Sequence, residues 1–216
     1  MKPVYEDGGI TLYHGNCDDL LKNLAPARVD MVLTDPPYGV SHRTNYSRFT
    51  GGVTQSVRDY MPIAGDDGVF DPLPLALRFK RCLLFGANNF AHRLPPGSWI
   101  VWDKRPKHGS KNIMSDGEVA WYSKGHGVYI YTHAWDGFVR ASERGESYHP
   151  TQKPVALMRW LLERYTAPGE VVLDPFMGAG PVAVACKQLG REYIGVELEG
   201  EYVETAIRRL ESTRPS

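Results

Sequence analysis

Short apolar runs alternate with amphipathic segments along most of the chain, and this alternation constrains the fold more than any other feature of the sequence. Each apolar run is short enough to be a strand, and several intervening segments carry apolar residues at helical spacing. The expected strands are Ile10–Tyr13, Val29–Thr34, Cys82–Phe85, Trp99–Trp102, Val119–Tyr122, Val128–Tyr131, Val171–Leu173 and Tyr193–Val196. The expected helices are Asp18–Leu24, one beginning at Asp71-Pro72, Pro154–Tyr165, Val182–Leu189, and a final helix that aligns Val203, Ala206, Ile207 and Leu210. The pattern predicts an α/β fold with a mainly parallel sheet, helices on both faces, and one antiparallel pair across Gly125-His126-Gly127.

Length and composition exclude several classes of protein. The 216 residues suffice for one domain, residues 1–216, with a sizeable core. Twenty-five basic residues balance 25 acidic ones, so any affinity for nucleic acid must come from local clusters. No apolar stretch approaches the roughly 20 residues that cross a bilayer, and the first residues lack a secretory signal. The three cysteines are far apart, which indicates a reducing compartment and predicts neither disulfides nor a metal site.

The tetrapeptide Asp35-Pro36-Pro37-Tyr38 directly follows the expected strand Val29–Thr34. Open α/β sheets bind their ligands in loops at the carboxyl ends of strands. The two prolines fix the backbone and lack N–H donors, so Asp35 and rigid carbonyls act as acceptors beside the flat ring of Tyr38. This combination suits a planar ring that carries an amino group. An ordinary turn at the end of a strand explains the tetrapeptide equally well when it is taken alone.

A second loop, Asp174–Gly180, lies between an expected strand and an expected helix. Gly178 and Gly180 allow a ligand to approach the backbone, and the N–H groups of the following helix attract a carboxylate or phosphate. Glu197 ends the next strand, where a carboxylate commonly binds the ribose of a nucleotide-like cofactor. The pattern does not separate a nicotinamide cofactor from other adenosine-containing cofactors, and a tight turn also explains the glycines.

Taken together, the motifs give the chain a family resemblance over nearly its whole length. They occur in the order Leu12–Cys17, Val29–Gly39, Trp102–Lys104, His149–Pro154, Val172–Gly180 and Tyr193–Glu197. In this order the chain resembles the amino-group DNA methyltransferases that use S-adenosylmethionine, in particular the circularly permuted β group. The resemblance implies a Rossmann-like class I methyltransferase domain in which the amino-binding loop precedes the cofactor loop.

The resemblance also assigns site residues. It implies that Asp35 and the Pro36 carbonyl accept hydrogen bonds from the amino group, that Tyr38 stacks on its ring, and that Asp35 borders the cofactor as well. The residues implied to hold the cofactor are Asp174, Phe176, Gly178 and Gly180 at its methionine part, Glu197 at its ribose, Asn16 and Cys17 at its adenine, and Thr151 and Lys153 at the methionine end. Two positions depart from the family, which usually has an acid at position 16 and a threonine at position 181. Asp18 is either a substitute for that acid or a helix-cap residue.

Two locally basic segments are candidates for contact with DNA, although solvated loops explain them as well. The first is the long loop 40–60 with Arg43 and Arg48, and the second holds Lys104, Arg105 and Lys107. No stretch is large enough for a separate target-recognition domain. The resemblance implies DNA as partner, the cytoplasm of a prokaryotic cell or a phage-infected host as location, and a connection to restriction-modification. It leaves open a homodimer and a cognate restriction nuclease.

The predicted activity is methyl transfer from S-adenosylmethionine to the exocyclic amino group of a flipped base in DNA. Adenine is favoured because an aspartate at position 35 resembles adenine-directed members, whereas serine is usual in cytosine-directed ones. Cytosine-N4 methylation, an inactive DNA-binding relative and a nicotinamide-dependent oxidoreductase remain as alternatives. The last of these leaves Asp35-Pro36-Pro37-Tyr38 without a function. The sequence does not specify the recognition sequence or whether the DNA is single- or double-stranded.

Overall fold

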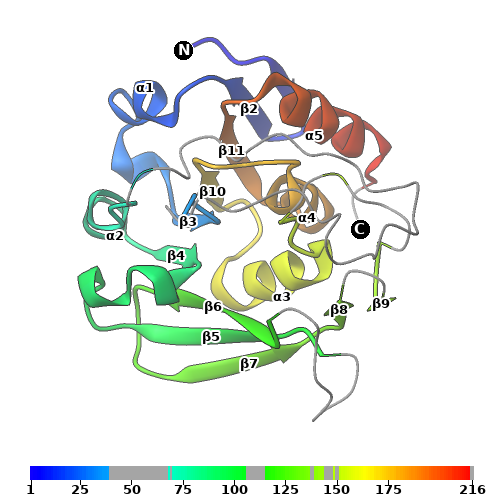
Figure 1. Cartoon of the computed structure of the whole chain (residues 1–216). Coiled ribbons are helices and arrows are strands. Elements are labelled where there is room, and N and C mark those ends of the chain that lie inside the picture. The colour runs from blue at the N-terminus through cyan, green and yellow to red at the C-terminus, as the bar shows by residue number, and fades with distance from the viewer. Residues whose placement is uncertain are drawn as a thin grey trace.

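A nine-stranded mixed sheet forms the middle of the computed structural model, which describes residues 1–38, 68, 70–105, 115–136, 139–143, 148 and 151–214 (Figure 1). The strand order is β1-β2-β11-β10-β3-β4-β6-β5-β7. The strands are β1 (Tyr5–Asp7), β2 (Ile10–His14), β3 (Met31–Thr34), β4 (Cys82–Phe85), β5 (Ser98–Asp103), β6 (Gly117–Tyr122), β7 (Val128–Thr132), β10 (Val171–Asp174) and β11 (Glu192–Glu197). The short strands β8 (Trp135–Asp136) and β9 (Val139–Arg140) pair separately.

The expected helices are present, with bounds that differ by a few residues. They are α1 (Cys17–Leu21), α2 (Leu73–Arg78), α3 (Val155–Tyr165), α4 (Pro181–Leu189) and α5 (Gly200–Ser212), with the 3-10 turns η1 (Pro26–Arg28), η3 (Ala87–Asn89) and η4 (Ala91–Arg93). Local sequence explains several helix ends. The Asn16 side chain accepts the Asp18 N–H and caps α1, and Pro181 occupies the first turn of α4 after the left-handed Gly180. No described helix is long and apolar enough to cross a membrane.

The central strands β2, β11, β10, β3 and β4 run parallel to one another, as the alternating pattern predicts. Strand β6 runs antiparallel to both of its neighbours, β4 and β5, whereas β7 runs parallel to β5. Two core clusters flank the sheet. One includes buried residues of α3, α4 and α5, such as Leu161, and the other includes Leu20 of α1 and Leu75 of α2. Helices therefore cover both faces of the sheet, as expected.

The predicted antiparallel pair across Gly125-His126-Gly127 is wrong, because β5 lies between β6 and β7. The Ser98 hydroxyl donates to the Lys124 carbonyl at 2.7 Å and accepts the Gly127 N–H at 3.2 Å, so the connection passes over the start of β5. Burial explains this order. Ile100 of β5 is fully buried, as a central strand requires. Strand β7 is the outermost strand on this side, and its Ile130 is 68% exposed.

Candidate active site

The carboxyl ends of the parallel strands place the predicted site residues along one edge of the sheet. Asp35 follows β3, Asp174 ends β10, and Glu197 ends β11. The chain continues from β3 to β4 on one side and from β10 to β11 on the other, so β3 and β10 flank a topological switch point. In open α/β sheets, ligands bind in the crevice at such a point. Because β6 is antiparallel, its first residues, including Glu118, lie at this same edge.

The Tyr38 side chain is oriented toward Asp35. Its hydroxyl donates a hydrogen bond to Asp35 Oδ1. The tyrosine ring lies against Gly86, directly after β4, where the backbone has φ +65°. A Cβ atom at position 86 would collide with this ring. Glycine is therefore required there, both for the left-handed backbone and for the space that Tyr38 occupies.

Asp35 is also paired with a buried lysine. Lys153, just before α3, donates to Asp35 Oδ2 and lies 3.1 Å from Glu118 Oε2, and its side chain is 5% exposed. Its Nζ lies 5.5 Å from the centre of the Phe85 ring. Burial raises the pKa of the Asp35 carboxyl, and Lys153 opposes this rise. Burial alone would lower the pKa of Lys153, but Asp35 and Glu118 hold it well above its usual value.

Asp174 joins the amino-binding loop to the glycine loop. Its Oδ1 accepts the Thr34 hydroxyl at 2.5 Å and the Phe176 N–H at 3.2 Å, and the Tyr193 hydroxyl lies 3.4 Å from Oδ2. Thr34 is the residue directly before Asp35, so the two motifs adjoin across β3 and β10. Burial raises the pKa of Asp174 to about 7, and the nearby Asp35 carboxylate contributes to this rise.

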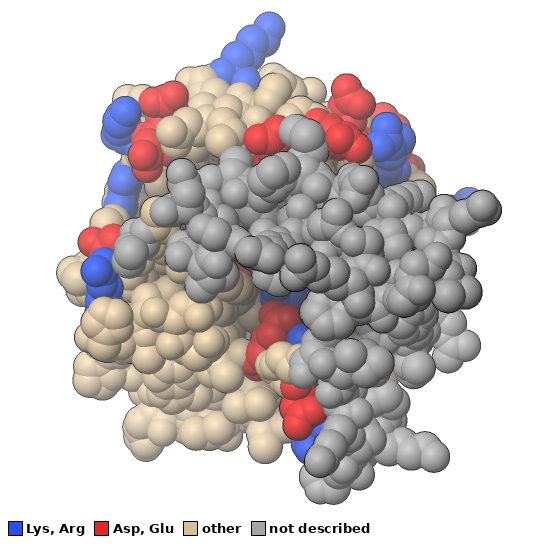
Figure 2. All heavy atoms as spheres, in the orientation of Figure 1, with Lys and Arg blue, Asp and Glu red and all other residues tan. Residues whose placement is uncertain are grey.

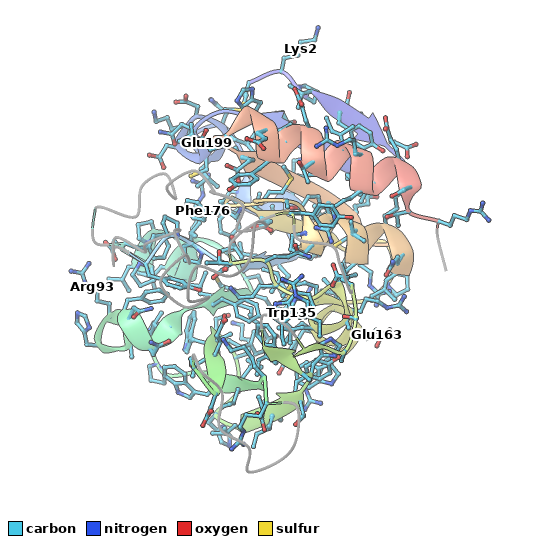
Figure 3. All side chains as sticks on the ribbon, turned by 45° about the vertical axis from the view of Figure 1, so that its right-hand side comes forward. Lys2, Arg93, Trp135, Glu163, Phe176 and Glu199 are labelled. Atoms are coloured by element: carbon cyan, nitrogen blue, oxygen red, sulfur yellow. The ribbon has the colours of Figure 1, made fainter. Side chains whose placement is uncertain are left out.

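The glycine loop is tied to Glu197. Glu197 Oε2 accepts the Gly178 N–H at 2.7 Å, and Oε1 accepts the Glu199 N–H at 2.9 Å. Burial raises the pKa of Glu197. A carboxylate has about four acceptor positions, so these two bonds leave capacity for hydroxyl donors. Phe176 packs edge-on against Phe70, and Figure 3 labels Phe176 and Glu199 in this region.

The turn after β2 adjoins the same edge. The Gly15 N–H donates to the Glu197 carbonyl at 2.9 Å, which places Asn16 and Cys17 beside the end of β11. Burial raises the pKa of the Cys17 thiol to about 11, so this thiol is neutral at neutral pH. The Asn16 side chain caps α1 through the Asp18 N–H, so Asn16 and not Asp18 is the capping residue.

Comparisons with known proteins agree with this arrangement. Residues 127–208, which include the glycine loop and Glu197, match a family described as DNA methylase. The Type II methyltransferase M2.LlaDCHI of Lactococcus lactis subsp. cremoris is 26% identical over 249 residues, which cover 97% of this chain and 92% of that protein. The chain is thus similar to a DNA methyltransferase over nearly its whole length.

Solved structures of methyltransferases share the fold of this chain. The crystal structure of the M1.HpyAVI–SAM complex is 23% identical, covers 93% of this chain and 98% of its own, and has a TM-score of 0.58. The PvuII DNA methyltransferase (cytosine-N4-specific) is 14% identical, covers 96% of this chain and 88% of its own, and has a TM-score of 0.65. The predicted Rossmann-like class I methyltransferase fold is confirmed.

The structure brings most of the predicted site residues to one edge of the sheet, but their functions stay predictions. The Lys153 ammonium lies against Asp35 and 3.5 Å from the Thr151 carbonyl. Lys104 is 12% exposed and pairs with Glu118 at 3.1 Å, and Arg105 binds both oxygens of Asp103. The predicted DNA contacts Arg43, Arg48 and Lys107, with the loop 40–60, lie outside the described residues.

Three residues near the site were not predicted. Thr34 holds Asp174, Gly86 makes room for Tyr38, and Glu118 pairs with Lys153. A polar residue at the end of an apolar strand is a local signal that would have indicated Thr34. A glycine directly after a strand is a weaker signal for Gly86. Nothing in the local sequence indicates Glu118, because its position depends on the direction of β6.

Proposed function

We propose that this protein transfers a methyl group from S-adenosylmethionine to the exocyclic amino group of a flipped base in DNA, with adenine favoured. One observation carries the proposal. The acceptor residue Asp35 and the glycine loop lie on either side of the β3–β10 switch point, joined by the bond between Thr34 and Asp174. An amino group at Asp35 would therefore lie next to a cofactor at the glycine loop.

The chemistry of an aromatic amine explains why Asp35 and Pro36 are needed. The nitrogen lone pair of such an amine is delocalised into the ring, which makes the nitrogen a poor nucleophile. Asp35 and the Pro36 carbonyl would accept hydrogen bonds from its two N–H groups and favour a more tetrahedral nitrogen. Tyr38 would support the ring after the base has left the stack. Orientation of the reactants and a fixed electrostatic environment then provide most of the rate enhancement, and no covalent intermediate with the protein is required.

The residues of the glycine loop fit an adenosine-containing cofactor. Glu197 keeps acceptor capacity for ribose hydroxyls beyond its bonds to Gly178 and Glu199. Gly178 and Gly180 have φ +53° and +71°, so the backbone can approach a ligand closely. Asp174 bonds the Phe176 N–H of this loop, and the Asp35 carboxylate is near enough to contribute to the raised pKa of Asp174, so two acidic groups adjoin the loop. S-adenosylmethionine supplies the activated methyl group when it is bound.

The base and the DNA contacts complete the proposal. Asp35 favours adenine by the family resemblance, and cytosine-N4 is the alternative outcome. Lys104 and Arg105 directly follow β5 at the same edge as Asp35, where phosphates of a DNA strand would be within reach. Contacts between these positive charges and phosphates would position the DNA but would not distinguish its sequence.

Asp35→Asn tests the acceptor function. The protein is incubated with labelled S-adenosylmethionine and a mixed DNA pool, and the modified nucleoside is identified by mass spectrometry. Transfer is expected to fall by at least about a hundredfold, the size of loss seen when one oriented polar group is removed from an active site. Cofactor binding is expected to stay largely intact, because the other residues implied to hold the cofactor are unaltered.

Asp30→Asn is the matched control, because Asp30 lies at the other end of the same strand and accepts the Val171 N–H at 2.9 Å. It is expected to keep the rate of transfer. Full activity in Asp35→Asn would contradict the acceptor function.

The cofactor is tested separately by thermal unfolding. S-adenosylmethionine or its demethylated product is expected to raise the unfolding temperature, because a ligand that binds only the folded state stabilises it. NAD is expected to have no effect. Gly178→Val, at φ +53°, should abolish the response. A response to NAD alone would instead support an oxidoreductase.

A further inference from the structure

Four charged side chains of alternating sign extend from the proposed reacting centre along the edge of the sheet. They are Asp35, Lys153, Glu118 and Lys104. Lys153 pairs with Asp35 and, at 3.1 Å, with Glu118, whose other oxygen lies 3.1 Å from Lys104. Figure 2 shows acidic and basic atoms together near the middle of this face. The ammonium of Lys153 is nearly buried, so its position depends on these two carboxylates.

We propose that Glu118 is a positioning residue for methyl transfer: it shares the Lys153 ammonium with Asp35 and thereby leaves Asp35 able to accept the amino group of the base. This inference rests on the proposed function. In the structure Asp35 accepts both the Tyr38 hydroxyl and the Lys153 ammonium. A carboxylate that held the ammonium alone would be a weaker acceptor for a neutral N–H donor, because the ammonium would neutralise its charge.

The geometry favours Glu118 over other groups as the second partner of Lys153. Glu118 lies on β6 with its carboxylate between Lys153 and Lys104, and its side chain as a whole is 29% exposed. Burial acts to raise the pKa of Glu118, but the two lysines together lower it below its usual value, so it is ionised at neutral pH. Among the described residues, the groups that face Asp35 include Lys153, Tyr38, Glu118 and Asp174. Glu118 is a carboxylate in this set that also forms an ion pair with Lys153.

The proposal predicts an unusual pH profile for Glu118→Gln. Glu118 repels the Asp35 carboxylate, which raises the pKa of Asp35, and it also shares the Lys153 ammonium that would otherwise act on Asp35 alone. In Glu118→Gln the pKa of Asp35 should fall, and the acid limb of the transfer rate should move to lower pH. The rate at the plateau should nevertheless fall by about tenfold, because Lys153 then pairs with Asp35 alone. A purely structural defect would lower the plateau without moving the acid limb.

The chain offers a matched control in Glu170. Its side chain has the same 29% exposure and pairs with Arg81 at 2.9 Å, but it precedes β10 at the opposite edge of the sheet. Glu170→Gln should leave the pH profile of transfer unchanged. Glu118→Asp keeps a carboxylate and should recover part of the rate.

Carboxyl NMR of protein labelled at aspartate provides a readout that does not require activity. The Asp35 resonance is assigned by its absence in Asp35→Asn and titrated in the unaltered protein, Glu118→Gln and Glu170→Gln. We expect a lower pKa of Asp35 in Glu118→Gln only.

An unchanged pKa, or a plateau rate equal to that of the unaltered protein, would overturn the assignment of Glu118. Absence of transfer by the unaltered protein on every DNA would refute the proposed function, whereas the titration would still decide the effect of Glu118 on Asp35.

Discussion

Asp174→Asn should make the protein more stable at alkaline pH and leave its stability nearly unchanged at acid pH. Asp174 is 2% exposed, and burial raises its pKa from the usual 3.8 to about 7. The folded state therefore binds this proton more tightly than the unfolded state does. The contribution of Asp174 to stability falls as pH rises from about 4 to about 7, and then stays constant.

The size of the effect follows from the pKa shift. A shift of this extent corresponds to about 4 kcal/mol, since each pKa unit is worth about 1.4 kcal/mol. Asparagine is neutral throughout this range, and its amide oxygen can keep the bonds from the Thr34 hydroxyl and the Phe176 N–H. The free energy of unfolding of the variant should exceed that of the unaltered protein by up to about 4 kcal/mol at pH 8. At pH 4 the two should differ little.

Urea denaturation at several pH values measures this difference as a free energy of unfolding. Asp19→Asn is the control for removing a carboxylate at the surface, because Asp19 is 62% exposed. A difference between Asp174→Asn and the unaltered protein that does not change with pH would refute the reasoning. A variant less stable at pH 8 would show that the carboxylate is stabilised by its hydrogen bonds more than it is destabilised by burial.

Two further predictions use matched pairs. Gly86→Ala should unfold more easily than Gly190→Ala in urea, because both glycines have φ +65° but only a Cβ at position 86 meets Tyr38; the strain of φ alone should cost about 1 kcal/mol, and equal losses would show that Tyr38 moves freely. Glu143→Ala should lower the free energy of unfolding by about 3 kcal/mol in the same assay, because Glu143 accepts the Val155 N–H in the first turn of α3 and pairs with the buried Arg209 of α5. Glu163 lies on the surface of α3 (Figure 3), so Glu163→Ala should change the free energy of unfolding by less than about 0.5 kcal/mol. A small effect of Glu143→Ala would mean that the other contacts of Arg209 suffice.

The local sequence determined much of this protein. Apolar periodicity predicts the strands and helices because each burial pattern is set by residues close together in the chain. Backbone chemistry predicts the turns in the same way. Gly180 and Pro181 mark the start of α4, and Asp35 with two prolines ends β3. The order of the motifs also predicts the fold, which the solved structures of methyltransferases confirm.

Only the tertiary structure decided how distant segments meet. The sequence predicted a hairpin between β6 and β7, but β5 lies between them, because strand order is set by burial across the sheet and not by the turn that follows a strand. Strand β6 pairs antiparallel with β4, and this direction brings Glu118 to the edge where Asp35 and Lys153 meet. Charged residues that are tens of positions apart in the chain interact only after the sheet has brought them together. A local sequence pattern therefore does not predict how far apart they lie in space.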